Sequence, residues 1–289
     1  MSSWEIVITG CGTSHGNPPW GYPSLWSDDP RDQRRRSGAL LRGPRGQILL
    51  IDVGPDLMHQ MRDPYRDWSG AGYPQRCITR CDGVLMTHDH ADHSHGINDL
   101  RHFNRLMGES IPVYGHADHL EQLLSMFPFC FGSRDELYHM GSPALVARDL
   151  IDGVPTGISG IDVRSFAMSH GPGGRTTGFR CGGLAYLTDL KELPTAAEEH
   201  LRGVDLLVLD MLREAPHPTH LNWDEALAVI ERVRPQRTVL THMGHEVRFA
   251  DWQSRLPPGV QMAHDGWHAS FDGGDDDSHG TLGRKASHA

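Results

Sequence analysis

Short apolar segments bounded by glycine, proline or aspartate recur along the whole 289-residue chain, and they limit the folds open to it. Their length and their content of branched aliphatic residues favour β-strands, and helical patterns separate many of them. The expected strands are 4–10, 47–53, 82–87, 111–115, 161–168, 182–188, 204–210 and 236–242; the expected helices are 93–107, 117–126, 195–202 and 222–234. Asn222 and Glu225 have the spacing of a capping box at the start of the last helix. Strands that alternate with helices predict an α/β domain.

Histidine and aspartate residues occupy the ends of several expected strands. The residues in these positions are Asp52, His88, His90, His170, Asp189 and His242. Ligands of α/β proteins bind beyond the carboxyl ends of the strands, where such side chains converge. The sequence therefore predicts one polar site assembled from segments that are far apart in the chain.

The segment THDHADH at residues 87–93 contains the densest group of these side chains. In an extended backbone, residues two apart face the same way, so His88 and His90 can reach one ion. Asp92 and His93 follow at the start of a helix and can face a second point. Imidazole and carboxylate groups together suit Zn, Mn, Fe or Ni. The motif predicts two divalent metal ions, roughly 3.5–4 Å apart as in two-metal sites.

The charge balance and the cysteine pattern exclude several functional classes. The formal net charge is −10, whereas a general nucleic-acid binder needs a basic face, so nucleic acid is not an expected partner. The chain has no apolar run of the roughly 18 residues that a membrane span requires. Its first residues lack the features of a signal peptide, and the five scattered cysteines contain no CxxC pair. These features predict a cytoplasmic protein with reduced thiols.

The expected organisation is one domain over residues 1–272, followed by a polar tail without fixed structure at 273–289. Residues 20–38 form a long segment rich in tryptophan, proline and charge. Long loops in compact domains are often functional, so this segment is a candidate part of the site.

In its combination of motifs, the sequence resembles the metallo-β-lactamase superfamily. The motifs appear in order as LLIDVG, THDHADH, MSHG, YLTD and LTHMGH, and they cover nearly the whole chain before the tail. The resemblance implies an αββα four-layer sandwich with a dinuclear metal site between the sheets. It also implies an enzyme, a metal-dependent hydrolase, with Mn or Zn as the metal.

The resemblance implies a role for each ligand-type residue. His88, His90 and His170 would hold the first metal ion. Asp92, His93 and His242 would hold the second metal ion, and Asp189 would bridge the two. Asp52 would orient a ligand rather than bind metal, in the way that a carboxylate fixes the tautomer of a coordinating imidazole.

Further segments resemble the PhnP-like phosphodiesterases of phosphonate breakdown. These segments are GCGTSHGNP, RRSGALL, IPVYG, THLNWDEAL and LTHMGHE. The match implies that His220 is a catalytic residue together with Asp92, with His217 as the weaker candidate. The implied substrate is a small phosphodiester, 5-phosphoribosyl 1,2-cyclic phosphate, and the product is ribose 1,5-bisphosphate. The ions would lower the pKa of an attacking water molecule, and His220 would bind the phosphoryl group or protonate the leaving oxygen.

One departure from this family concerns the segment before the second motif, which lacks the cysteines of the family's structural zinc site. Without them His245 has no partners for zinc, so packing of Trp20, Tyr22 and Trp26 is expected to hold the segment unless it is mobile. Arginine suits phosphate binding. The candidates for holding a second phosphate are Arg34, Arg35, Arg36 and Arg175, with His264 as a further residue on the substrate side.

Three other activities of the same superfamily remain open from the sequence. A tRNA 3′-processing endonuclease shares the metal motifs, although the chain has no basic inserted arm. A thioester or lactone hydrolase would use the same metals on a carbonyl group. A PqqB-like carrier would keep the fold without catalysis. A homodimer is a common assembly for soluble enzymes and is open here as well.

Overall fold

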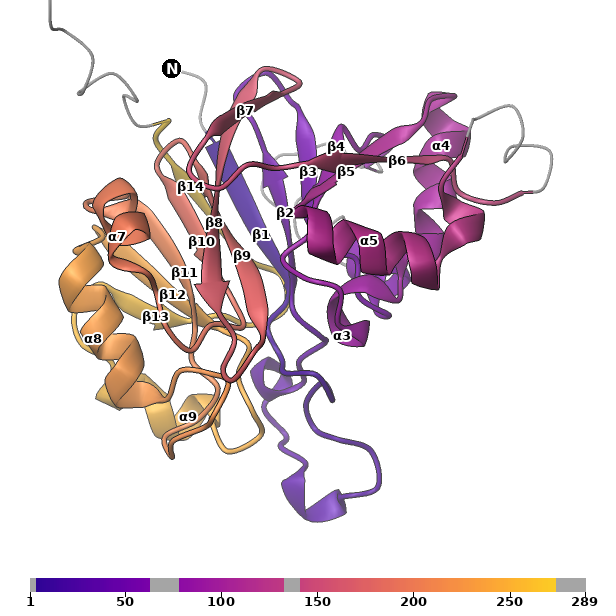
Figure 1. The fold of residues 1–289 in the computed structure, drawn as a ribbon. Helices are drawn as coiled ribbons and strands as arrows, with labels where there is room; N and C mark the ends of the chain where they lie inside the picture. Colours follow the sequence, from indigo (N-terminus) through magenta and orange to yellow (C-terminus); the bar gives the residue numbers. More distant parts are fainter. Residues whose placement is uncertain (1–3, 63–77, 133–140, 274–289) are drawn as a thin grey trace, which may run out of the picture.

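The computed structural model describes residues 4–62, 78–132 and 141–273. Two seven-stranded sheets face each other, and helices cover both outer sides (Figure 1). The first sheet has the order β14-β1-β2-β3-β4-β5-β6, and the second has the order β13-β12-β11-β10-β9-β8-β7. This arrangement confirms the predicted αββα four-layer sandwich.

The strands of the first sheet are β1 (Trp4–Gly10), β2 (Gly38–Arg42), β3 (Ile48–Ile51), β4 (Gly83–Leu85), β5 (Ile111–Gly115), β6 (Leu145–Asp149) and β14 (Trp267–Phe271). Those of the second are β7 (Pro155–Ile158), β8 (Ile161–Ser169), β9 (Arg175–Cys181), β10 (Leu184–Leu187), β11 (Leu206–Asp210), β12 (Arg237–Thr241) and β13 (Val260–Met262). Helices α1 (Leu57–Arg62), α3 (Ala91–Ser94), α4 (Arg101–Met107) and α5 (Ala117–Met126) belong to the first half. Helices α7 (Thr195–Leu201), α8 (Trp223–Val233) and α9 (Phe249–Trp252) belong to the second half.

Parallel strands form one part of each sheet. Strands β3, β4, β5 and β6 pair in parallel in the first sheet, and β10, β11, β12 and β13 do so in the second. The carboxyl ends of parallel strands meet at one edge, which is where α/β proteins bind ligands. Each half of the molecule therefore brings the residues that follow its parallel strands to a common edge.

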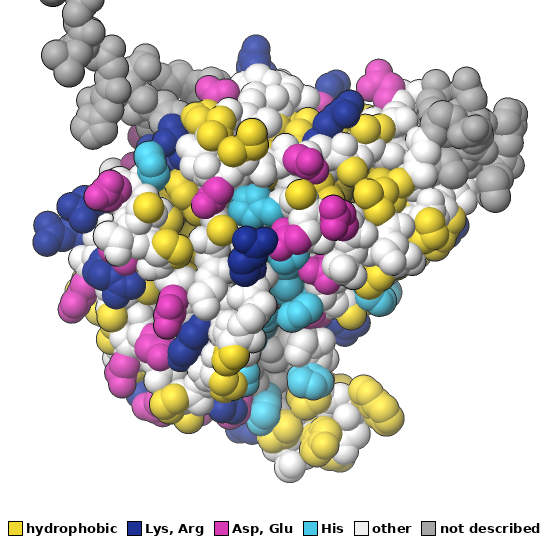
Figure 2. Space-filling model, viewed as in Figure 1, with side chains coloured by type: hydrophobic (Ala, Val, Ile, Leu, Met, Phe, Trp, Pro, Cys, Tyr) yellow, Lys and Arg dark blue, Asp and Glu magenta, His cyan; other side chains and the backbone are white. Residues whose placement is uncertain are grey.

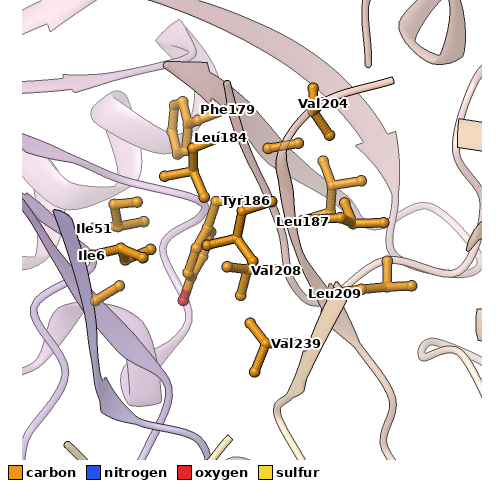
Figure 3. Close-up of a cluster of buried hydrophobic side chains, with 14 of the residues drawn as sticks. Ile6, Ile51, Phe179, Leu184, Tyr186, Leu187, Val204, Val208, Leu209 and Val239 are labelled. Carbon is orange, nitrogen blue, oxygen red and sulfur yellow. The ribbon is translucent and has the colours of Figure 1, made fainter. Parts of the chain in front are cut away.

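The alternation of side chains along each strand divides the core into two layers. Ile6 and Ile8 of β1 pack between the sheets, whereas Val7 packs under the helices of the first half. Tyr186 of β10 lies close to Ile51 of β3 in the space between the sheets (Figure 3). In a sequence, strands that are buried on both faces are continuous apolar runs, so strands of this kind can be predicted from the sequence. Burial of each large aliphatic side chain contributes about 1.5–3 kcal/mol.

All eight predicted strands are present, and the capping box of Asn222 and Glu225 at the start of α8 is confirmed. The prediction of one helix over 93–107 was wrong, because α3 and α4 are separated by a 3₁₀ turn at Ile97–Leu100. The break begins at Gly96, where a Cβ atom would lie 2.0 Å from the carbonyl oxygen of Gly54. A side chain at residue 96 would therefore push the metal motif away from the segment after β3.

The prediction that aromatic packing holds residues 20–38 was wrong. Trp20, Tyr22 and Trp26 are 92%, 60% and 59% exposed. A buried ion pair between Asp32 and Arg34 holds the base of this segment instead, with a distance of 2.9 Å between Asp32 Oδ1 and Arg34 Nη2. The polar residues of the segment are thus its internal support, and the apolar ones face outward.

No helix among the described residues is both long enough and apolar enough to cross a membrane. The predicted tail at 273–289 lies outside the described residues, apart from Gly273.

Candidate metal centre

Residues that follow strands of both sheets converge on one polar cluster. His88 and His90 follow β4, His170 follows β8, Asp189 follows β10 and His242 follows β12. Asp52, Asp189 and His242 have positive φ angles of 61°, 56° and 58°. This left-handed conformation costs of order 1–3 kcal/mol for a residue with a side chain, and such strain clusters at functional sites. The chain turns sharply at these three points, directly after its strands.

The first group within the cluster consists of His88, His90 and His170. One nitrogen atom from each of these imidazoles lies within 4.8 Å of those of the other two. The centroid of the His88 ring is 4.4 Å from that of His90 and 5.4 Å from that of His170. Burial lowers the pKa of both His88 and His170, so both imidazoles are neutral at pH 7. A neutral imidazole is the form that binds a metal ion.

The second group consists of Asp92, His93, Asp189 and His242, and its potential ligand atoms also lie within 4.8 Å of one another. Nε2 of His93 is 3.2 Å from Oδ2 of Asp92 and 3.2 Å from Oδ2 of Asp189. Nε2 of His242 is 3.3 Å from Oδ1 of Asp189. Burial alone would lower the pKa of His93, but Asp189, Asp52 and Asp92 outweigh it and raise that pKa well above its usual value. The same carboxylates would favour a bound cation.

Several buried ligand atoms in the two groups make no hydrogen bond within the described part of the chain. They are Nε2 of His88, His93 and His242, and Oδ2 of Asp189. A buried polar atom that makes no hydrogen bond costs free energy even where an opposite charge lies near it, so each such atom in a folded protein calls for an explanation. Nitrogen and oxygen donors that point into a shared space fit divalent metals such as Zn or Mn.

Asp52 contacts His93, one of the candidate ligands, at the ring nitrogen that does not face the cluster. Its Oδ2 atom is 2.7 Å from Nδ1 of His93, so it can accept the proton of that nitrogen and leave Nε2 facing the cluster. Thr87 donates its backbone N–H to Oδ1 of Asp52 at 2.8 Å and its hydroxyl to Oδ2 at 2.8 Å. Burial raises the pKa of Asp52, while His93 and Thr87 oppose that rise.

His220 lies at the side of the cluster nearest β11. Its ring stacks on that of His242 with centroids 4.8 Å apart, and the His170 ring is 5.0 Å away. Nδ1 of His220 is 3.2 Å from Oδ2 of Asp210, the last residue of β11. Oδ1 of the same carboxylate is 3.7 Å from Nδ1 of His242. Asp210 therefore faces two imidazoles at once.

Asp210 is a site residue that the sequence analysis missed. It ends the segment VDLLVLD, so it has the same signal that identified Asp52, a carboxylate at the end of a predicted strand. His119 and Asp89 were missed as well. Nδ1 of His119 on α5 is 2.7 Å from Oδ1 of Asp89, which lies between His88 and His90 in the motif. This contact joins α5 to the Asp89 side chain of the motif.

The predicted substrate residues lie outside these groups. Arg36 pairs with Asp56, with 3.2 Å between Nε and Oδ2, and Arg175 pairs with Asp118 on the surface. His264 Nδ1 lies 3.0 Å from the carbonyl oxygen of Asp265. The ring of His217, the weaker catalytic candidate, is tilted against that of His220 at a centroid distance of 5.1 Å.

Arg34 is not a free phosphate-binding group. Its side chain is fully buried, and its guanidinium donates to the carbonyl oxygens of Gly244 and Val247 in addition to its ion pair with Asp32. The prediction of Arg34 as a phosphate ligand was therefore wrong, because its donors are already used inside the protein.

Among curated proteins, the chain is similar to a protein of Porphyromonas gingivalis (strain ATCC BAA-308 / W83) named octanoyltransferase. The two are 27% identical over 274 residues, which is 93% of this chain and 52% of that protein. The chain thus spans about half the length of that relative.

Among solved structures, a diphosphatase of the PhnP family is 30% identical, with a TM-score of 0.79 over 93% of this chain and 98% of that one. The zinc-bound PqqB protein of Methylobacterium extorquens is 19% identical, with a TM-score of 0.68 over 92% of this chain and 99% of that one. The second likeness concerns the fold alone.

A family model described as the β-lactamase superfamily domain matches residues 47–243, which include every residue of both groups. The match extends from the segment before Asp52 to the residue after His242, and both sheets contribute to it. The four-layer fold, the cluster of histidines and aspartates and this match agree with one another. The chain therefore belongs to the metallo-β-lactamase superfamily, a superfamily of hydrolases that bind divalent metals.

Proposed function

We propose that this protein is a metal-dependent phosphodiesterase. The observation that carries the proposal is the position of His220, which is bound by Asp210 and lies against both groups of candidate ligands. The similarity to a diphosphatase of the PhnP family supports a phosphoric ester as the substrate. The finer proposal is a cyclic sugar phosphodiester, 5-phosphoribosyl 1,2-cyclic phosphate, hydrolysed in a cytoplasmic pathway of phosphonate breakdown.

In this proposal two divalent ions, Mn or Zn, have separate sets of ligands. His88, His90 and His170 would hold one ion; Asp92, His93 and His242 would hold the other; and Asp189 would serve both. When bound, the ions would lower the pKa of a water molecule and offset charge on the phosphoryl oxygens. Asp92 contributes to catalysis as a ligand, and Asp52 keeps Nε2 of His93 directed at its ion.

His220 moves the proton in this proposal. When Nδ1 of His220 donates to Asp210, the lone pair or proton that remains available to a substrate is at Nε2. A protonated Nε2 donates to the oxygen of the leaving group as the ester bond breaks, which is worth about 10²–10⁴-fold in rate. The contact between Asp210 and Nδ1 keeps the ring oriented with Nε2 towards the substrate.

A second candidate function is the hydrolysis of an acyl thioester. One observation favours it, namely the likeness to a relative that is named octanoyltransferase. The chain covers only 52% of that relative but 98% of the PhnP-family diphosphatase, so the phosphodiesterase is the better supported proposal.

The test is turnover by protein reconstituted with Mn or Zn, with His220→Ala and His217→Ala run in parallel. The substrates are bis-p-nitrophenyl phosphate, 5-phosphoribosyl 1,2-cyclic phosphate and an octanoyl thioester. We expect hydrolysis of the phosphodiesters, its loss on treatment with a chelator, and about a 10²–10⁴-fold lower rate for His220→Ala with its metal retained.

The substrates separate the alternatives. Hydrolysis of the generic diester without the cyclic sugar would keep the reaction class and reject the substrate. Turnover of the thioester alone would reject the phosphodiesterase. An equal loss in His217→Ala would transfer the catalytic role to that residue, and no turnover at full metal loading would favour a carrier of the PqqB type.

A further inference from the structure

His90 differs from the other histidines of the two ligand groups, because no hydrogen bond or ion pair holds its ring within the described part of the chain. Histidine side chains lie on the surface along the middle of the face in Figure 2, and His90 is the exposed member of its group. The polar partners of the others are Thr87 for His88, Asp52 for His93, Thr219 for His170 and Asp210 for His242. A metal-binding histidine almost always has such a partner, which fixes the direction of its ring. The position of His90 therefore has to come from its backbone.

This backbone is held through the neighbouring residue, Asp89. The chain at His90 is extended, with φ −55° and ψ 151°, and neighbouring side chains of an extended chain point to opposite sides. Asp89 reaches α5, where its Oδ1 atom accepts the Nδ1–H of His119 at 2.7 Å. Ser94 donates its hydroxyl to the carbonyl oxygens of Asp89 and His90, both at 2.9 Å. Contacts from two other segments thus fix the backbone that carries His90.

The start of α5 is itself attached to both halves of the molecule. His116, the residue before the helix, contacts Ser165 of β8 and Thr177 of β9 through its two ring nitrogens, each at 3.3 Å. Leu120 is buried in the core layer of the first half. His119 lies between these two anchors, so it is attached to a helix that is held independently of the metal motif.

The His119 side chain is buried at a cost that core packing alone does not explain. The residue is only 7% exposed, and its Nε2 atom makes no hydrogen bond within the described residues. An apolar side chain of similar size would fill this space without a buried polar atom. The ring centroids of His119 and His88 are 6.4 Å apart, and His119 belongs to neither ligand group. Its bond to Asp89 is thus the contact through which it acts on the motif.

We propose that the pair of Asp89 and His119 positions His90, and with it the first ligand group, by fixing the backbone of the motif. The pair does for His90 what a contact at the ring does for the other ligands. His119 is a positioning residue, since it acts through Asp89 and the backbone. The inference rests on the proposed two-ion site but not on the proposed reaction, so the binding of metal alone tests it.

The test measures zinc binding by the metal-free full-length protein in competition with a chromophoric chelator. His119→Phe keeps a ring but removes the donor, and we expect it to weaken the binding of one of the two ions about tenfold, at the lower end of the effect of lost partners of metal ligands. His119→Asn keeps an amide N–H close to the position of Nδ1 and should retain most of the affinity. Anomalous diffraction at limiting zinc should show the lost occupancy between His88, His90 and His170.

Three further measurements separate positioning from charge and from general stability. Asp89→Asn removes a charge near the ions and also breaks the pair, whereas His119→Phe keeps that charge, so a loss in both variants identifies the contact. The double variant should bind zinc no more weakly than Asp89→Asn alone, because the two residues act as a unit. Glu121→Gln changes an exposed residue of the same helix and should bind both ions as wild type does. Urea unfolding without metal measures the stability of each variant separately.

Wild-type affinity for both ions in His119→Phe would overturn the inference. Lower stability of the metal-free variant with unchanged zinc affinity would make the pair a support of α5 alone. Lost occupancy only between Asp92, His93 and His242 would assign the effect to the other ion and overturn it too. The absence of zinc binding by wild-type protein would reject the two-ion site together with this role. The expected zinc affinities without hydrolysis of any ester would support the role of the pair and reject the proposed reaction.

Discussion

Each half of the molecule supports its part of the site with one buried aspartate at a strand end, but the two aspartates are used differently. In the first half, Asp52 follows β3 and contacts one candidate ligand, His93, at 2.7 Å, with Thr87 donating two hydrogen bonds to it. In the second half, Asp210 ends β11 and faces His220 at 3.2 Å and His242 at 3.7 Å.

The difference between the contacts of Asp52 and Asp210 indicates that the two halves support the site in different ways. A carboxylate with short bonds and one imidazole partner fixes a ring in place, which suits a metal ligand. A carboxylate that lies between two imidazoles at longer distances links their positions, so a displacement of His220 also affects His242. In the proposed reaction, residues of the first half would hold metal, and residues of the second half would hold metal and also move a proton.

The largest expected effect is that of Asp210→Asn. The amide keeps the size of the side chain but weakens the contact that orients His220, so the rate should fall about 10²–10⁴-fold. The rate should be measured at saturating metal, and bound metal per chain should be determined by elemental analysis. If the whole loss were restored by added metal, Asp210 would be a support for His242 alone and the contrast with Asp52 would disappear.

Asp52→Asn should act mainly on metal binding. Loss of a carboxylate behind a coordinating imidazole typically weakens metal affinity about 10–100-fold, and His93 loses that partner here. Metal titration followed by activity should show an activity that recovers at high metal concentration. Full metal affinity combined with a low rate would reverse the roles assigned to the two halves.

The pH dependence of stability should report on the junction between the halves. Asp265 lies between β13 and β14, where its carboxylate accepts the backbone N–H groups of Cys11 and Arg35. Burial raises its pKa from 3.8 to about 7, so the folded state binds a proton that the unfolded state has released. Its contribution is complete below about pH 4 and is lost as the pH rises through 7, with a slope of at most about 1.4 kcal/mol per pH unit.

Urea unfolding of the metal-loaded protein between pH 5 and 8 measures this effect. Asp265→Asn has no proton to lose and should show a shallower decline of the free energy of unfolding with pH. The exposed residue Asp162 offers a matched control, since Asp162→Asn should keep the slope of the wild-type protein. A parallel decline in wild type and Asp265→Asn would exclude Asp265 as the source.

The smallest effect is expected for Glu225→Gln in the second half. Oε1 of Glu225 lies 2.5 Å from Nζ of Lys191, which also contacts the carbonyl oxygen of His220 at 3.4 Å. The pair is partly exposed, so its loss should cost only about 0.2–1 kcal/mol of unfolding free energy. Thermal unfolding beside Glu231→Gln, on the same helix, tests this. A loss of several kcal/mol would mean that the second half depends on this contact far more than its exposure suggests.

The sequence predicted the four-layer fold because strands buried on both faces have a local signature, as in the runs of β3 and β11. It also identified the residues that cluster at the strand ends, since histidine and aspartate are unusual there. Asp210 was not predicted, because its two partners, His220 and His242, lie on other segments and give no local signal. Strand β9 was missed for a similar reason. Its Gly178 leaves room for the side chain of Leu187, and this contact gives no local signal in the sequence.

The segment at residues 20–38 shows a further limit of prediction. Aromatic residues usually indicate packing, so Trp20 and Trp26 were expected to hold the segment. The actual support is the pair of Asp32 and Arg34, whose burial depends on carbonyl groups of Gly244 and Val247, more than 200 residues away in the chain. Burial of a charged pair is decided by such distant partners and cannot be read from its neighbours.

The left-handed turns at Asp52, Asp189 and His242 have a consequence for the evolution and engineering of this protein. Glycine adopts this backbone conformation at no steric cost, so it would relieve local strain at each of the three positions. Selection for heat tolerance alone would therefore favour glycine at these positions, which would remove the side chains that build the cluster. The backbone strain at these three turns is thus a stability cost of the side chains that they carry into the candidate centre.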